Sequence, residues 1–287
     1  MGIQKVGIIA NSSKESAVDY TCRLSEWLLK KGLEVFLDEE IADKAGIIPG
    51  ISRKELASLV DIIVVFGGDG TLLMASRSVG GLDVPIVGVN LGGFGFMTVV
   101  NLNEMFSTME FILKGDYKTS KRMMLDAILE SDDEQKIEHS ALNDIVISRG
   151  DLSRMINLET FVDDRYLTTY KADGLIISTP TGSTAYSLSA GGPIVLPDLN
   201  SIIINPICPH TLTNRPIMLP PDSVVRIVLG PKEGNATATF DGQISVVMKS
   251  GDTIIVNKST NYINLIDSPH HDYLEILRTK LGWGGLL

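Results

Sequence analysis

The periodicity of apolar residues changes once along this chain, near Tyr117. Before this point, short apolar runs alternate with helix-length segments, which is typical of parallel βαβ units. After it, apolar and polar residues largely alternate with a period of two, which favours antiparallel sheet. The length of 287 residues, set against about 150 for a typical domain, also favours two domains. The sequence therefore predicts an α/β N-terminal domain followed by a β-rich domain.

Four apolar runs in the first part have the length of buried strands, at residues 6–10, 33–37, 61–66 and 85–90. Helices are predicted after the N-cap candidates Asn11–Ser13, with a stop at Gly32, after the capping box Ser52–Glu55, and over residues 103–114, with a stop at Gly115. A last helix over residues 273–281 has an apolar face, which another part of the chain must cover.

In the second part, period-two segments predict strands at residues 136–147, 157–169, 223–229 and 252–257. A further strand is expected at residues 201–205. It lies within a Pro-rich stretch from Pro193 to Pro221, which we interpret as ordered loops because the stretch is also rich in Ile and Leu. Neither an internal repeat nor a flexible linker is evident.

The charge balance and the apolar runs exclude several classes of function. The chain has 25 Lys and Arg against 35 Asp and Glu, a net charge of −10, so it offers no broad basic field for nucleic acid. Its apolar runs of about five residues are far shorter than the ~20 that cross a bilayer, and no secretory signal is recognisable. We expect no membrane partner and a cytoplasmic location. Cys22 and Cys208 stand far apart, which indicates neither a disulfide framework nor a zinc site.

The most informative short motif is Gly67–Thr71, Gly-Gly-Asp-Gly-Thr, between a buried strand and a predicted helix. In an open parallel sheet, ligands bind beyond the carboxyl ends of the strands. Glycines let the backbone approach a phosphate, and the helix N-terminus offers N–H groups to it, which would place Asp69 beside the reacting group. Alternatively, the motif is a tight turn in which Asp69 only caps the helix. A P-loop is excluded because no Gly in this chain precedes a Lys.

A second informative block runs from Lys171 to Pro193 and has the pattern of a strand, a hydroxyl-rich turn, a short helix and a glycine stop. Its hydroxyls and small side chains between Ser178 and Ser189 could line a pocket for a polar, planar ligand such as a nucleotide. Alternatively, these Ser and Thr residues cap the helix and satisfy backbone groups.

Several weaker features leave alternatives open. Asn143–Asp144 is a polar pair in a strand-like segment, where it would either meet a ligand or lie in an edge strand. Asp241–Gln243 is foremost a hairpin signal. The loop Leu91–Phe96 would either approach a ligand or cross between domains. His210 lies in a loop without a second His at ligand spacing, so no metal site is predicted, and His270–His271 is expected at a solvated entry to the last helix.

Taken in order along the chain, these motifs resemble those of the NAD kinase family. The resemblance covers about residues 5–270 and rests on Gly67–Thr71, Asn90–Thr98, Asn143–Asp144, Asp173–Pro193, Pro209–His210, Arg215–Pro216 and Asp241–Gln243. Lipid kinases share the glycine turn, and phosphofructokinases have a variant of it, whereas the block Asp173–Pro193 is far more discriminating. The sequence departs from the family pattern at Asp144, where many members have Glu, and in Gly92–Met97, which replaces a more usual leucine-containing loop.

The resemblance implies a Rossmann-like α/β N-terminal domain and a β-rich C-terminal domain, α+β overall, with the C-terminal helix returning to the first domain. The implied domains are residues 1–98 together with 270–287, which carry the glycine turn, and residues 99–269, which bind NAD. Because family members are commonly dimers or tetramers, we expect a homodimer or a homotetramer.

The resemblance also implies roles for individual residues. Asp69 would be the general base, and the phosphates of ATP would lie on Gly67, Gly68, Gly70 and Thr71. The residues expected to hold NAD are Asp69, Gly70, Asn143, Asp144, Arg154, Lys171, Asp173, Thr184, Ala185, Tyr186, Ser187, Leu188, Ser189 and Gln243.

The expected reaction transfers the γ-phosphoryl group of ATP to the adenosine 2′-hydroxyl of NAD and gives NADP. Phosphoryl transfer requires mainly positioning and charge neutralisation, and Mg²⁺ is expected to arrive on the ATP phosphates. One alternative is a lipid kinase of the diacylglycerol type, which would also need a membrane-facing surface. Another is a noncatalytic NAD(H)-binding sensor, which would not need the base Asp69.

Overall fold

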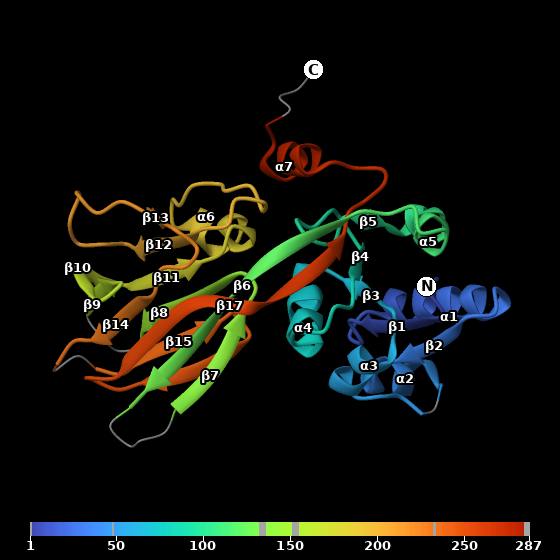
Figure 1. Cartoon of the computed structure of the whole chain (residues 1–287), viewed down its shortest axis with the longest axis horizontal. Helices are drawn as coiled ribbons and strands as arrows, with labels where there is room; N and C mark the ends of the chain where they lie inside the picture. The colour runs from blue at the N-terminus through green and yellow to red at the C-terminus, as the bar shows by residue number, and fades with distance from the viewer. Residues whose placement is uncertain (1, 48, 132–135, 151–154, 232–233, 284–287) are drawn as a thin grey trace. The chain divides into compact units, whose positions relative to one another are not determined.

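The computed structural model describes residues 2–47, 49–131, 136–150, 155–231 and 234–283. The chain divides into two compact units, which are described separately below. Unit 1 comprises Met1–Lys121 and Ile263–Leu287, and unit 2 comprises Arg122–Tyr262. Two long strands, β6 (Thr119–Glu130) and β17 (Thr253–Ile266), cross the boundary in sequence and connect the units (Figure 1).

Unit 1 is built on a parallel sheet, as the alternating pattern predicted. Its strand order is β2-β1-β3-β4, and a short strand β5 pairs with β4. The bounds are β1 (Lys5–Ala10), β2 (Glu34–Leu37), β3 (Ile62–Gly67), β4 (Ile86–Asn90) and β5 (Val100–Asn101). Strand β3 is buried along its whole length, which explains its continuous apolar sequence.

The helices of unit 1 connect and cover these strands (Figure 1). Their bounds are α1 (Glu15–Lys30), α2 (Glu39–Ala45), α3 (Arg53–Leu59), α4 (Asp69–Val79), the 3₁₀ turn η1 (Leu102–Glu104), α5 (Met105–Leu113) and α7 (Tyr273–Leu281). The return of the last helix to the first unit is confirmed, because Ile276 of α7 packs in the hydrophobic core of unit 1.

Helix starts show where local sequence signals succeeded and failed. The capping prediction at Ser52 is confirmed, since its Oγ accepts a hydrogen bond from the backbone N–H of Glu55 at 3.4 Å. The prediction that Asn11–Ser13 cap α1 is wrong: the N-cap is Lys14, which makes no side-chain cap bond. The Asn11 side chain instead accepts from the N–H and hydroxyl of Ser13, a local turn that competes with capping.

Unit 2 is antiparallel, as predicted, and contains two sheets. One has the order β13-β12-β11-β8-β15-β16; in the other, β10, β9, β14 and β17 are neighbours, and β6 pairs with β17 and β7. The bounds are β7 (Lys136–Ala141), β8 (Asp144–Arg149), β9 (Ile156–Val162), β10 (Arg165–Ala172), β11 (Gly174–Ser178), η2 (Thr181–Thr184), α6 (Tyr186–Ser189), β12 (Ile202–Ile207), β13 (Ile217–Leu219), β14 (Val225–Leu229), β15 (Ala236–Phe240) and β16 (Ile244–Met248). One hydrophobic core takes side chains from both sheets.

Two of the predicted single strands are each a pair of strands. Residues 136–147 divide into β7 and β8, which lie in different sheets with Leu142 and Asn143 between them. Residues 157–169 form a hairpin of β9 and β10, whose turn residues Asp163 and Asp164 have φ of 49° and 62°. In both cases a polar pair, Asn143–Asp144 or Asp163–Asp164, interrupts the alternation where the two strands separate.

The compact units differ in extent from the domains expected from sequence, because residues 99–121 and 263–269 belong to unit 1. Helix α5 explains most of this difference, since its buried residues Met105, Met109 and Ile112 pack in the core of unit 1.

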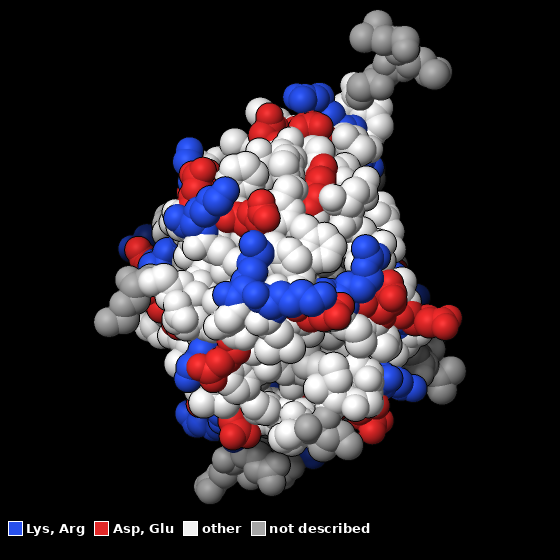
Figure 2. Space-filling model, turned by 90° about the vertical axis from the view of Figure 1, so that its right-hand side faces the viewer, with Lys and Arg blue, Asp and Glu red and all other residues white. Residues whose placement is uncertain are grey.

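Figure 2 shows Lys and Arg side chains beside Asp and Glu side chains on one face of the molecule. Helix α1 contains an exposed ion pair, in which Lys30 Nζ lies 3.3 Å from Glu26 Oε1. Exposed pairs of this kind contribute little to stability, about 0–1 kcal/mol each.

Candidate functional site

Several polar segments of unit 1 lie at one edge of its sheet. The strands are parallel, with Ile8 opposite Leu37, Ala10 opposite Phe66, and Gly67 opposite Asn90. The segments that follow β1, β2, β3 and β4 therefore all begin at the carboxyl edge, where open α/β sheets bind ligands.

The Asp69 carboxylate at this edge binds the loop that follows β4. Oδ1 accepts from the backbone N–H groups of Met97 and Thr98, each at 3.0 Å, and from the Thr98 hydroxyl at 3.1 Å. Oδ2 accepts from the N–H of Phe96 at 2.8 Å. The N-cap of α4 is Gly68, so these bonds to the loop replace the cap bond that was the alternative for Asp69.

The loop at Asp69 is held from its other side as well. Asn90 Nδ2 donates to Thr98 Oγ1 at 2.8 Å, and Asn90 Oδ1 accepts from the N–H of Gly92 at 2.7 Å. A Cβ at Gly95 would collide with Asp69 Oδ1, so this close approach requires glycine. This part of the loop Leu91–Phe96 therefore lies directly against the Asp69 carboxylate.

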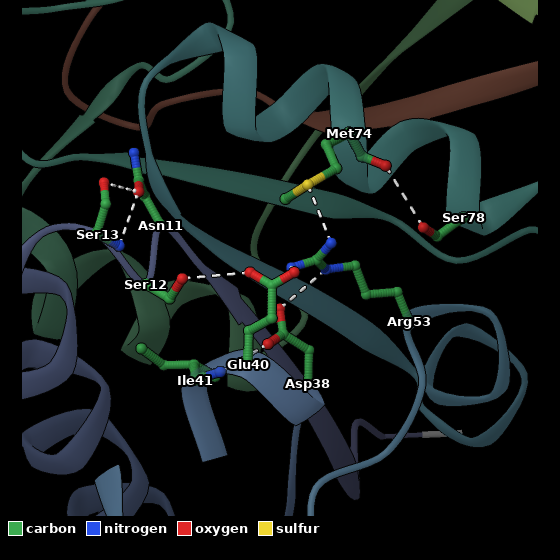
Figure 3. Close-up of polar contacts among 9 residues, drawn as sticks. All are labelled: Asn11, Ser12, Ser13, Asp38, Glu40, Ile41, Arg53, Met74 and Ser78. Carbon is green, nitrogen blue, oxygen red and sulfur yellow. Dashed lines mark hydrogen bonds and ion pairs between the residues drawn. The ribbon is translucent and has the colours of Figure 1, made fainter. Parts of the chain in front are cut away.

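A polar cluster at the ends of β1 and β2 lies at the same edge (Figure 3). The Arg53 guanidinium bonds Asp38 Oδ2 at 3.1 Å, pairs with Glu40 Oε1 at 2.9 Å and contacts Met74 Sδ at 3.0 Å. Ser12 Oγ donates to Glu40 Oε2 at 3.2 Å. Because Met74 belongs to α4, Arg53 connects this cluster to the helix that begins at Asp69.

In unit 2, the Asn143–Asp144 pair lies at the start of an interior strand. Strand β8 stands between β11 and β15, so the edge-strand alternative for this pair is wrong. The Asp241 carboxylate accepts from three successive backbone N–H groups, those of Leu142 at 3.1 Å, Asn143 at 2.7 Å and Asp144 at 3.3 Å. Asp241 and Gly242 have φ of 51° and 64°, as the predicted hairpin turn requires.

The Asn143 side chain is buried with an unused acceptor. The residue is 8% exposed, and its Oδ1 has no hydrogen-bond partner among the described residues. Its backbone carbonyl is in use, since it accepts from Thr179 N–H at 2.9 Å and Ser178 Oγ at 3.2 Å. A buried polar atom without a partner is costly, so this amide oxygen marks a position where a ligand donor would be accepted.

Asp144 is also buried, and its surroundings disfavour the charged form. Burial, followed by the nearby charge of Asp241, raises the pKa of Asp144 from 3.8 to about 7, although a bond from the backbone N–H of Tyr186 works in the opposite direction. Asp144 therefore links β8 to α6 and titrates near neutrality.

Most hydroxyls in the turn after β11 bond to backbone groups, which supports the structural alternative for them. Thr179 Oγ1 donates to Leu142 O at 2.6 Å, and Ser183 Oγ donates to Pro180 O at 2.7 Å. Ser187 is fully buried and accepts from Asn205 Nδ2 at 3.2 Å. The half-exposed Tyr186 and the exposed Ser189 remain accessible in this segment.

The other predicted NAD contacts in unit 2 lie farther along its strands. Asp173 precedes Gly174, which is opposite Ser148, whereas Ser178 at the far end of β11 is opposite Asp144. Asp173 Oδ1 pairs with Arg149 Nε at 3.3 Å, and Lys171 is exposed on β10. Gln243 is exposed in the turn after Gly242, and Arg154 lies outside the described residues.

Sequence reasoning missed Asp38 and Arg53 as parts of these sites, and it singled out Asp241 only within the motif Asp241–Gln243, without its contacts. Asp38 follows β2 directly and is fully buried, so its place at the carboxyl edge was the available signal. Arg53 and Asp241 act through contacts far away in sequence, for which local patterns give no signal.

The pKa of Asp144 predicts an unusual pH dependence of stability. A carboxyl whose pKa rises on folding stabilises the protein at low pH, and this contribution is lost as pH rises from about 4 to about 7. The asparagine side chain of the Asp144→Asn variant is neutral at every pH. The free energy of unfolding of this variant should therefore exceed that of the wild type by about 1 to 4 kcal/mol at pH 8, and by less at pH 5.

Urea unfolding at both pH values measures this difference. Asp126→Asn is the matched control, since it replaces another carboxyl of unit 2, which accepts from Ser140 Oγ at 2.6 Å. The raised pKa of Asp144 is contradicted if the free energy of unfolding of Asp144→Asn differs from that of the wild type by the same amount at pH 5 and pH 8.

Among the described residues, no group of three His, Cys, Asp or Glu side chains stands close enough together to hold a metal ion. None of the described helices combines the length and apolar character needed to cross a membrane.

Comparison with known proteins finds matches along the whole chain. The family model described as the ATP-NAD kinase N-terminal domain matches residues 6–117, and the one described as the ATP-NAD kinase C-terminal domain matches residues 142–268. The NAD kinase of Syntrophotalea carbinolica is 44% identical over 98% of this chain and 99% of its own length. The NAD kinase of Geotalea daltonii is 46% identical, again over 98% of this chain and 99% of its own length.

Two solved structures are also similar. A yeast NADH kinase complexed with NADH superposes with a TM-score of 0.93 and 27% identity, covering 100% of this chain and 90% of the other. An NAD kinase from Archaeoglobus fulgidus in complex with ATP has a TM-score of 0.73 and 25% identity, covering 97% of this chain and 98% of the other. NADH is bound in the yeast protein and ATP in the Archaeoglobus fulgidus protein.

Proposed function

Because the chain belongs to the NAD kinase family, we propose that it transfers the γ-phosphoryl group of ATP to the adenosine 2′-hydroxyl of NAD, with Asp69 as the general base. The product is NADP, and the enzyme is a phosphotransferase. Matches over nearly the full length of both chains support this function rather than a lipid kinase or a noncatalytic NAD(H)-binding sensor.

The single observation that carries the NAD-binding assignment is the buried, unpartnered Oδ1 of Asn143. Asp241 fixes the backbone of this residue, so the side chain is positioned before any ligand arrives. We assign the remaining NAD contacts to Asp69, Gly70, Asp144, Arg154, Lys171, Asp173, Gln243 and the accessible part of the segment 184–189. Ser187, which is buried, would hold that segment in place.

The hydrogen bonds of Asp69 suggest which of its oxygens takes the proton. A carboxylate oxygen has about two lone-pair sites. Oδ1 accepts three hydrogen bonds and is saturated, whereas Oδ2 accepts one from Phe96 and retains acceptor capacity. In the proposed step, the 2′-oxygen forms a bond to the γ-phosphorus, the bond between this phosphorus and the β–γ bridging oxygen breaks, and Oδ2 accepts the hydroxyl proton.

We assign the donor phosphates to Gly67, Gly68, Gly70 and Thr71 at the start of α4, where glycines permit close approach and the helix dipole favours negative charge. Mg²⁺ on the phosphates would neutralise their charge, and such an ion needs few protein ligands. The cytoplasmic location and the homodimer or homotetramer stay predictions.

The test of the function is incubation of pure protein with ATP, Mg²⁺ and NAD, followed by an assay for NADP. A kinase forms NADP in proportion to the ATP consumed. A sensor binds NAD without consuming ATP, and a lipid kinase phosphorylates diacylglycerol but not NAD.

Asn143→Ala should raise the Kd for NAD by about 5- to 150-fold, because a polar ligand atom loses its partner at a cost of about 1 to 3 kcal/mol. Calorimetry with NAD measures this change. Asn264→Ala is the matched control, since it removes an exposed amide that is bonded to Asp83. An Asn143→Ala protein that melts like the wild type and binds NAD equally well would refute the assignment.

A further inference from the structure

His271, at the start of the last helix, is held between two carboxylates. Its Nε2 lies 3.0 Å from Glu104 Oε1 in η1, and its Nδ1 lies 3.2 Å from Glu275 Oε1 in α7. Its side chain is only 16% exposed. The expectation of a solvated histidine at this position is therefore wrong for His271. Two carboxylates facing the two ring nitrogens favour the doubly protonated imidazolium, in which both nitrogens are donors.

The ring of His271 also contacts the loop that binds Asp69. The ring of Phe94 packs edge-on against it, with the ring centroids 4.6 Å apart. Phe94 stands two residues before Phe96, the first of the three residues whose backbone N–H groups bond the Asp69 carboxylate. This loop is also where the sequence departs from the usual leucine-containing pattern of its family.

We propose that His271 is a positioning residue for phosphoryl transfer: clamped between Glu104 and Glu275, it holds Phe94 and thereby the loop that orients Asp69. The proposal rests on the proposed function of Asp69. The last helix thus contributes to the reaction through packing against the loop. The other side of the loop is held by Asn90, so loss of the His271 contact should loosen the loop without releasing it.

The pair of hydrogen bonds that hold His271 between Glu104 and Glu275, here called the clamp, responds to pH through the groups that face His271. They are Glu104 from η1, Glu275 from its own helix, and the neighbouring His270, whose ring centroid is 6.5 Å away. Burial opposes the charged imidazole, but the hydrogen bonds and charges of Glu104 and Glu275 outweigh it and raise the pKa of His271 above its usual 6.5. The clamp is therefore complete below pH 6.5 and is lost as pH rises through the raised pKa.

Measurements on the wild type, His271→Gln and Glu104→Gln test the proposal. His271→Gln should lower kcat by about threefold to thirtyfold, the range of coupling through packed neighbours. In the wild type, kcat should decrease as pH rises. The pH at the midpoint of this decrease should equal the midpoint of the His271 imidazole titration that NMR measures. In Glu104→Gln, both midpoints should move to lower pH together. Hydrogen exchange at Phe96 and Met97 should be faster in His271→Gln.

His270→Gln is the matched control, because His270 lies 3.3 Å from Ser107 Oγ and packs against Phe111, both on α5. It should retain the wild-type kcat. The proposal is overturned if the kinetic midpoint does not follow the His271 titration, or if exchange at Phe96 and Met97 is unchanged. A wild-type protein that makes no NADP would instead refute the proposed function, and the exchange measurement would still decide whether His271 holds the loop.

Discussion

Asp69→Asn is expected to lower kcat by about 10² to 10⁴, the range associated with a positioned acid or base. Asparagine has nearly the same size, and its carbonyl oxygen can still accept from the N–H groups of Met97 and Thr98. Its NH₂ group, at the position of Oδ2, can neither accept from Phe96 nor take up the substrate proton. The loss should therefore appear mainly in kcat at saturating ATP and NAD.

The loop contacts of Asp69 require a control that separates proton transfer from loop anchoring. Thr98→Val removes the hydroxyl that donates to Asp69 Oδ1 at 3.1 Å and leaves the carboxylate intact. The substitution also removes the hydrogen bond that Thr98 Oγ1 accepts from Asn90 Nδ2 at 2.8 Å. Its kcat should still fall by less than about tenfold, which is a smaller loss than the one expected for Asp69→Asn. If a folded Asp69→Asn enzyme retains more than about a tenth of the wild-type kcat, the general-base role is rejected.

The parallel sheet of unit 1 was predictable because its strands carry a strong local signal. Residues 62–66 are continuously apolar, end at a glycine turn and are fully buried, as a central parallel strand must be. Helix α2 was missed because only Ile41 and Ala42 are buried on it, too few to show a helical period. Its ends did carry signals, since Asp38 caps Ile41 N–H at 2.9 Å and Gly46 has a φ of 68°.

The identities of the candidate site residues were easier to predict than their contacts. The glycine turn and the polar pair Asn143–Asp144 stood out because their residue types are unexpected between apolar strands. However, the carboxylates of Asp69 and Asp241 each accept hydrogen bonds from three successive backbone N–H groups. Asp69 accepts from residues 96–98, and Asp241 accepts from residues 142–144. Backbone donors have no signature in sequence, so these contacts become visible only in the folded chain.

Asp69 and Asp241 have the same structural role, and this role affects binding and catalysis. In each unit, one carboxylate fixes a short segment next to a group assigned to the reaction: the loop at Asp69 itself, and the Asn143 side chain beside Asp241. Polar groups positioned in advance lose little conformational freedom when a ligand binds. Substitutions that shift either segment should therefore affect binding or catalysis more than the lost contact alone would indicate.

Gly182→Ala should be among the most damaging single changes in unit 2. A Cβ at Gly182 would collide with the backbone carbonyl of Asn143 and lie 2.6 Å from Ser178 Oγ. Backbone cannot yield as a flexible side chain does, so the turn after β11 must move away from Asn143 or Asn143 must shift. Overpacking of this kind costs about 1 to 3 kcal/mol of stability. Because Asn143 moves with its carbonyl, we also expect the Kd for NAD to rise at least about tenfold, the equivalent of 1.4 kcal/mol.

A thermal melt and NAD calorimetry on the same sample measure both effects of Gly182→Ala. Gly93→Ala is the control for the melt, because a Cβ at Gly93 meets no atom within 4 Å and should leave the Tm nearly unchanged. A Gly182→Ala protein with reduced stability but unchanged NAD affinity would contradict this prediction and show that the turn after β11, rather than Asn143, moves to accommodate the Cβ.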